Sequence, residues 1–106
     1  MPASALSWQR YGAPKLDATT VRVALSTTAA RSTQLARGIY RMILDVDSFV
    51  LQGDATVTAS AASDAICVGG QEYHFVVEDP ATDGYLSIVA GAGTGTAYLT
   101  QVAEVI

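Results

Sequence analysis

The chain contains 106 residues, the length of one domain, and has a formal net charge of −4. Half of the residues are hydrophobic and only 15% are charged, against about 25% in an average soluble domain. These values exclude separate catalytic and binding lobes and indicate a weakly charged surface of the kind that other subunits bury. We therefore expect a protein that binds or builds rather than one that catalyses.

Charge is distributed unevenly along the sequence. The first 42 positions hold all six basic residues and one acidic residue, a net charge of +5, and the remaining 64 hold nine acidic residues and no basic one, a net charge of −9. The basic residues are Arg10, Lys15, Arg22, Arg31, Arg37 and Arg41. This split indicates either a basic arm for a polyanion or two halves that attract each other within one fold or across a subunit contact. We favour mutual attraction and expect no nucleic-acid partner, because the basic residues are not clustered.

The single cysteine and the N-terminal sequence limit the cellular setting. Cys67 is the only cysteine, so the chain forms no intrachain disulfide, and we expect it to be a small buried hydrophobic residue. The first eight residues lack a charged region followed by a long apolar stretch, and no run of 18 apolar residues occurs. We expect no membrane association and folding in a reducing cytoplasm.

Alternation of apolar and polar residues predicts the first strands. Residues 1–18 are predicted to form an N-terminal arm or edge segment, and residues 19–106 a single β-sandwich domain. A half-buried strand is predicted over 19–26, a loop or short helical turn over 27–37, and a clear strand over 39–46, which continues through 48–52 to a turn at Gly53. Asp45 and Asp47 are predicted to share the outer face of that strand with Arg41. Residues 55–65 are predicted to form an edge strand or an ordered loop.

The second half continues the same pattern. Residues 66–68 lead into a Gly69-Gly70 turn, and a strand is predicted over 72–78 with Tyr73, Phe75 and Val77 on one face. A loop follows over 79–84, then strands over 85–90 and 96–105, separated by a glycine-rich turn. Seven or eight short strands without a long helix predict an all-β fold, an antiparallel β-sandwich of jelly-roll type. An immunoglobulin-like topology remains the alternative.

The motifs that could support chemistry do not meet its requirements. The Gly91 to Gly95 turn lacks the following helix and the lysine of a phosphate-binding loop. Asp45, Asp47 and Asp54 lack the glycine and distal glutamate of a calcium loop. His74, the only histidine, is predicted to be a hydrogen-bonded surface residue. We therefore predict no catalytic residue, no cofactor and no metal.

Several strand and turn motifs between residues 31 and 100 occur together in one order. They are the turn at 32–35, Gly38-Ile39-Tyr40-Arg41, the segment 45–53, the segment 69–77, the segment 86–90 and Gly93-Thr94-Gly95-Thr96. In this order the chain resembles small virion proteins of tailed bacteriophages, specifically capsid decoration or cement proteins. The resemblance covers about two-thirds of the chain and implies a small β-sandwich without catalytic residues.

The resemblance implies a structural virion protein that binds the major capsid protein and stabilises the shell through protein–protein interfaces. It implies a dimer or trimer located on the capsid surface after synthesis in the host cytoplasm. A cement protein needs complementary surface rather than reactive groups, which agrees with the composition. The candidate interface residues are Trp8, Arg10, Tyr11, Lys15, Arg22, Arg31, Arg37 and Arg41.

A tail or baseplate component, or a carbohydrate-binding β-sandwich module, is the alternative function. Sugar rings stack on exposed aromatic side chains, and the chain offers six that could serve. They are Trp8, Tyr11, Tyr40, Tyr73, Tyr85 and Tyr98. Most of these are expected to lie in the core or in protein interfaces instead.

Overall fold

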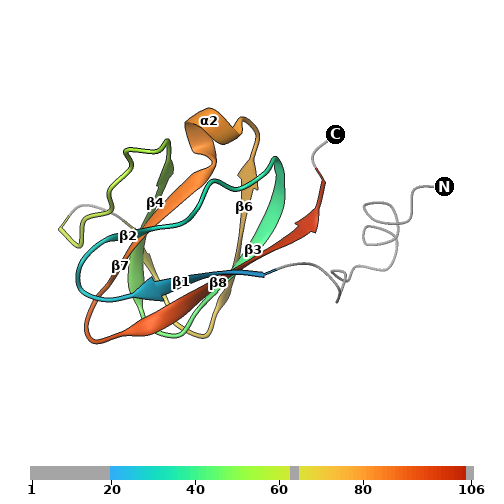
Figure 1. Ribbon diagram of the computed structural model, residues 1–106. Coiled ribbons are helices and arrows are strands. Elements are labelled where there is room, and N and C mark those ends of the chain that lie inside the picture. The colour runs from blue at the N-terminus through green and yellow to red at the C-terminus, as the bar shows by residue number, and fades with distance from the viewer. Residues whose placement is uncertain (1–19, 63–64, 105–106) are drawn as a thin grey trace.

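The computed structural model describes residues 20–62 and 65–104, which form two four-stranded antiparallel sheets packed face to face (Figure 1). The first sheet has the order β1-β8-β3-β6, with β1 at Thr20–Leu25, β8 at Gly95–Ala103, β3 at Gly38–Leu44 and β6 at Glu72–Val77. The second sheet has the order β2-β7-β4-β5, with β2 at Ala30–Arg31, β7 at Tyr85–Ala90, β4 at Ser48–Gly53 and β5 at Ile66–Cys67. The prediction of an all-β sandwich is confirmed.

The strand order identifies the type of sandwich. Successive strands pass from one sheet to the other at most connections, and β4 and β5 are the one sequential pair of described strands that lie side by side. Eight strands in this order make the two Greek keys of a jelly roll. An immunoglobulin domain would place its first two strands in the same sheet, whereas β1 and β2 here lie in different sheets.

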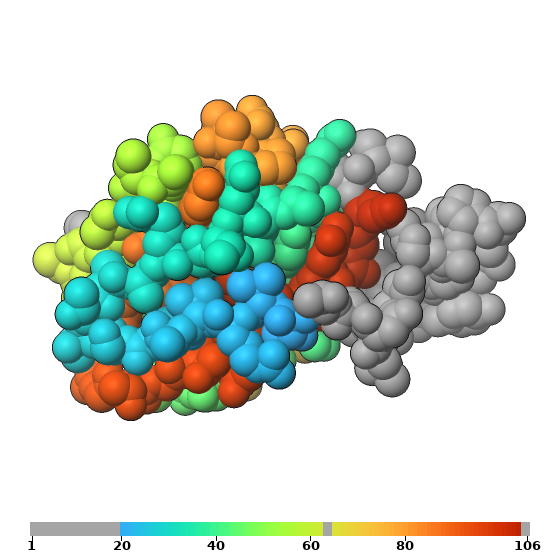
Figure 2. All heavy atoms as spheres, viewed as in Figure 1, coloured from blue at the N-terminus to red at the C-terminus, as the bar shows by residue number. Residues whose placement is uncertain are grey.

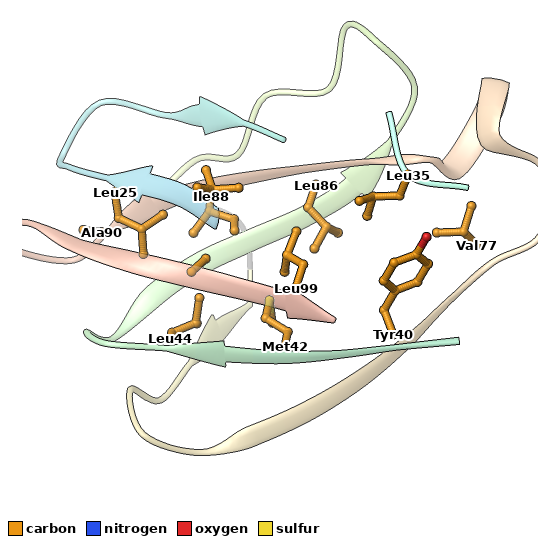
Figure 3. Packing of buried hydrophobic residues seen from close by; sticks show 12 residues of the cluster. Leu25, Leu35, Tyr40, Met42, Leu44, Val77, Leu86, Ile88, Ala90 and Leu99 are labelled. Carbon is orange, nitrogen blue, oxygen red and sulfur yellow. The ribbon is translucent and has the colours of Figure 1, made fainter. Parts of the chain in front are cut away.

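Large apolar side chains from both sheets meet between the layers (Figure 3). Alternation along β3 places Tyr40, Met42 and Leu44 inward, where they face Leu86 and Ile88 from β7. Each of these side chains is almost completely removed from water. Burial of this kind supplies roughly 1.5 to 3 kcal/mol for each large side chain, so the core rather than any cross-link holds the sheets together.

An aromatic pair extends the core toward β6. The rings of Tyr40 and Phe75 are stacked, with centroids 5.3 Å apart and planes inclined by 11°. The Tyr40 hydroxyl donates a hydrogen bond of 2.7 Å to the Ala36 carbonyl. Burial is the main cause of the raised pKa of Tyr40, which stays a protonated donor at neutral pH.

Two predicted loops contain short regular elements. Residues 27–37 contain the two-residue strand β2, and Leu35 in the same segment is buried in the core. Residues 79–84 contain a one-turn helix, α2 (Pro80–Asp83), whose first turn is capped by the Asp79 side chain accepting from the Ala81 N–H at 3.2 Å. Proline at the first helical position agrees with this start, because its missing donor would otherwise be unpaired.

The loop at residues 54–62 covers the outer face of the second sheet. The Ala59 N–H donates to the Ser87 hydroxyl at 2.8 Å, and the Arg31 guanidinium donates to the Val57 carbonyl at 2.9 Å. Ser87 is only 1% exposed although its side chain points away from the sandwich core. Of the two possibilities left open for residues 55–65, the ordered loop is therefore the one observed over 55–62.

The aspartates at the end of β3 have a role that the sequence did not predict. Asp45 accepts a hydrogen bond from the Thr96 N–H at 3.2 Å, and Asp47 accepts one from the Gly69 N–H at 2.8 Å. Their carboxylates therefore hold connections at one end of the sandwich. Val46 between them packs against the core, so alternation continues for two residues beyond Leu44.

Replacing Leu99 by alanine is expected to destabilise the fold strongly. Leu99 is 0% exposed at the centre of the first sheet, so truncation leaves a cavity and lowers the free energy of unfolding by about 2 to 5 kcal/mol. Urea denaturation measures the difference. Val68→Ala, at a 46% exposed side chain, is the matched control and should change stability little; equal losses in the two variants would contradict the described core.

Candidate protein-binding face

The outer face of the first sheet is left uncovered by the described residues, and we call it the open face. Strand register arranges its side chains in rows across the four strands. The open face consists of Arg22, Tyr98, Ile43 and Glu72 in one row, Thr20, Arg41 and His74 in the next, and Ile39 with Val76 in the third. Thr100, at the register position between Thr20 and Arg41, is only 6% exposed. The face is broad and combines charged, apolar and aromatic groups.

An arginine and a tyrosine form a contact at the β1 end of the open face. The Arg22 guanidinium carbon lies 5.7 Å from the centre of the Tyr98 ring. A cation above an aromatic face is stabilised by about 0.5 to 1 kcal/mol at an exposed site. Arg22 is therefore held against the sheet, and the Tyr98 ring is partly shielded by it. Arginine and tyrosine are among the residues that protein interfaces favour.

The β6 end of the open face carries the only histidine. His74 Nε2 lies 3.6 Å from Glu72 Oε1, with the two side chains 47% and 53% exposed, and its register partner on β3 is Arg41. An ion pair this exposed contributes at most about 1 kcal/mol. Because the partners of His74 are an acid and a base rather than a hydroxyl or thiol nucleophile, the geometry agrees with the predicted surface histidine.

Aliphatic side chains lie between these charged ends. Ile39 and Ile43 on β3 are half-buried, and Val76 on β6 is 42% exposed. Tyr98, Ile43 and Ile39 on the inner strands β8 and β3 give the open face a largely apolar centre, within which Arg41 is the one charged side chain. Apolar groups mixed with arginine and tyrosine are typical of surfaces that bind protein.

The structure separates the predicted interface residues. Arg22 and Arg41 lie together on the open face, and Arg37 is exposed just before β3. Arg31 lies on the opposite side, where its hydrogen bond to Val57 helps to hold the loop at 54–62. The other four predicted residues, Trp8, Arg10, Tyr11 and Lys15, lie outside the described residues.

Sequence reasoning missed the apolar part of the open face. Ile39, Ile43 and Val76 alternate with inward-facing residues on their strands and therefore lie on the outer face. The sequence analysis treated that face as polar and overlooked that these three side chains are apolar. The sequence pattern could have shown this. Where alternation assigns every second position of a strand to the outer face, an apolar residue at one of those positions lies on that face.

The described tyrosines are mostly engaged in the fold. Tyr40 is buried, and the Tyr73 hydroxyl accepts a hydrogen bond of 2.8 Å from the Val68 N–H. Tyr85 is half-buried at the start of β7 and Tyr98 lies beneath Arg22. No open aromatic platform therefore stands out among the tyrosines of the described chain.

Cys67 is less buried than predicted. It lies on the edge strand β5 at intermediate exposure, and desolvation raises the pKa of its thiol. In residues 20–62 and 65–104, no three His, Cys, Asp or Glu side chains are grouped so that they could hold a metal ion. Across the same residues, no helix is long and apolar enough to cross a bilayer.

Comparisons with known proteins gave one structural likeness. No family model matches the chain, and no curated protein matches it. Among solved structures, a chain described with the disulfide-linked pili of Bacillus endospore appendages is similar, with 18% identity and a TM-score of 0.43. The similarity covers 83% of this chain and 87% of that chain. The functional argument therefore depends on this chain's own residues.

The Cys67 thiol is expected to react slowly in the folded protein. A thiol with a raised pKa holds less thiolate at neutral pH, and the thiolate is the nucleophile. Alkylation by iodoacetamide at pH 8 should be several-fold slower in the native protein than in urea, and its pH midpoint should lie above that of free cysteine. Faster alkylation in the native protein would contradict this environment.

Proposed function

We propose that this protein is a structural component of a tailed-bacteriophage virion that binds the major capsid protein and stabilises the shell. It acts through protein–protein contacts, without catalysis and without a cofactor, as a dimer or trimer on the capsid surface. Two independent features support the role: the order of strand and turn motifs in the sequence, and the open face of the first sheet.

The open face is the observation that carries the proposal. Its partner is a protein surface because the face combines an apolar centre with arginine and tyrosine at one end and offers neither a pocket-lining acid pair nor a nucleophile. The outer face of the second sheet is partly covered, since Ala59 in the loop at residues 54–62 donates to Ser87, and it exposes Leu51 and Ile66. A broad face that combines apolar and charged groups is suited to closing a boundary between shell subunits.

Electrostatics favour an acidic patch on the partner beneath the β1 end of the open face. Arg22 lies on β1 itself, Arg41 lies on the inner strand β3, and the basic residues Arg10 and Lys15 precede β1 in the chain. Positive groups at the rim steer association and set orientation more than they add affinity. Binding to the shell should therefore weaken with added salt mainly through a slower association rate.

Loss of the protein from a virion is expected to weaken the particle. Virions made without it should release their genome at a lower temperature or under milder osmotic shock, and adding back the purified chain should restore resistance. Particles of unchanged stability would contradict the proposal. A sugar preference on a glycan array would instead favour the carbohydrate-binding alternative.

Introducing a charge at the centre of the open face is expected to weaken binding to the shell. Ile43→Asp places a carboxylate in the apolar centre, where it would lose its water on contact, so affinity for shells lacking the protein should fall by about 30-fold or more. Sedimentation with purified shells measures binding, and circular dichroism checks the fold. Val68→Asp, away from the open face, is the control; the opposite ranking would place the binding surface elsewhere.

A further inference from the structure

The first sheet ends in two long strands that have one free side each. β1 pairs only with β8 and β6 pairs only with β3 among the described strands, and each contains six residues. In Figure 2 the blue atoms of β1 and the cyan atoms that follow it lie at the near surface. The second sheet ends in β2 and β5, which are two residues long. Free strand sides are templates for pairing with another chain unless they are blocked.

Hydrogen bonds fix which groups of β6 point to its free side. The Val76 carbonyl accepts a hydrogen bond of 2.8 Å from the Gln52 side chain, so Val76 presents its backbone away from β3. Backbone direction repeats every second residue along a strand, which gives His74 and Glu72 the same orientation. Their N–H and C=O groups therefore face outward, while the Val76 carbonyl already has a partner within its own chain.

The same argument applies to β1. The Asp45 N–H donates to the Thr96 carbonyl at 3.1 Å, so Thr96 and, by alternation, Tyr98 direct their backbone groups toward β3. Arg22 is the register partner of Tyr98 on the other side and forms a non-hydrogen-bonded pair with it. The backbone groups of Arg22 and Thr20 consequently point to the free side of β1.

The two free sides have opposite charge. β1 carries Arg22 and no acidic residue. β6 and the residues through α2 carry no basic residue and four acidic ones, Glu72, Glu78, Asp79 and Asp83. The split between the basic and acidic halves of the sequence thus becomes a difference between two sides of one molecule, which is the arrangement that attracts a second copy.

We infer that copies of this chain assemble head to tail, with β6 of one copy pairing antiparallel to β1 of the next. Strands in the first sheet alternate in direction and are four in number, so a copy placed in the same orientation continues the alternation without a break. Pairing Arg22 with Glu72 and Thr20 with His74 joins opposite charges and leaves the Val76 carbonyl bonded to Gln52.

This inference deepens the proposed function, because it names how copies meet while the open face binds the shell. A head-to-tail contact uses two different surfaces, so it closes into a ring or grows as a row, in contrast to a two-fold dimer. The backbone groups that pair lie at strand sides, so the edge residues of the open face meet the neighbouring copy while Tyr98, Ile43 and Ile39 on the inner strands stay free. Self-association and shell binding can therefore be measured separately on the same full-length chain.

Charge exchange between β1 and β6 tests the pairing. Arg22→Glu and Glu72→Arg should each weaken self-association of the purified chain by about tenfold, because like charges then lie opposite each other, and the double variant should restore it. Sedimentation across a concentration series measures association. Arg37→Glu and Glu104→Arg make the same charge changes at exposed positions off these strands and should have little effect.

Cross-linking distinguishes the head-to-tail arrangement from a two-fold one. In a Cys67→Ala background, Thr20→Cys combined with His74→Cys should give a ladder of multimers with a short bismaleimide, and each single cysteine should not. Dimers from Thr20→Cys alone, or a chain that stays monomeric at every concentration reached, would overturn the inference. A monomer that still binds shells would leave the proposed function standing, and an assembling chain that does not bind shells would refute that function alone.

Discussion

The hydrogen bond between the Ala59 N–H and the Ser87 hydroxyl determines which surfaces this sandwich can offer. Any two-layered sheet protein buries its inner faces in one core and is left with two outer faces. Here the loop at residues 54–62 covers part of one of them, where Ser87 is buried although Leu51 and Ile66 remain exposed. A buried hydroxyl left without its partner costs about 1 to 3 kcal/mol, so the loop and the sheet stabilise each other. The first sheet has no such cover among the described residues and is left to bind.

The fold determines where the basic and acidic residues lie relative to one another. In the sequence, basic and acidic residues occupy successive halves, which is compatible with attraction inside the fold. The fold instead separates them: Arg22 is held on Tyr98 at one side, and Glu72 lies beside His74 at the other, with two strands between them. Within the described chain, hydrogen bonds from Thr56 and the charge of the nearby Arg31 lower the pKa of Asp54, whereas Arg22 and Arg41 form no salt bridge with a carboxylate. In the proposed function, these two arginines attract other molecules.

Elements with strict alternation were predictable from the sequence, and elements fixed by side-chain-to-backbone bonds were not. The strand containing Tyr40, Met42 and Leu44 was predicted over 39–46 and spans Gly38–Leu44, and its inward face was correct because period-two burial is a local property. Strand order depends on contacts distant in sequence, which alternation does not encode. The roles of Asp47 and Ser87 escaped prediction for the same reason, since their partners Gly69 and Ala59 lie 22 and 28 residues away. The open face was predicted in part. Arg22 and Arg41 were candidate interface residues because of their charge, whereas only strand register shows that Ile43 and Tyr98 lie on the same face.

In the proposed function, a small domain has to bind the shell and also bind neighbouring copies. The open face and the free sides of β1 and β6 are the two surfaces for these contacts. One copy on a flat face of this size gains limited affinity, because association costs several kcal/mol of lost freedom before any net binding appears. If copies are joined at β1 and β6, the first copy that binds the shell holds the others close to it. Their open faces then bind at a high effective concentration, and most of the lost freedom of motion is incurred only once. In the proposed function, strand sides therefore bind neighbouring copies and the open face binds the shell, and added salt weakens both contacts because each involves arginine.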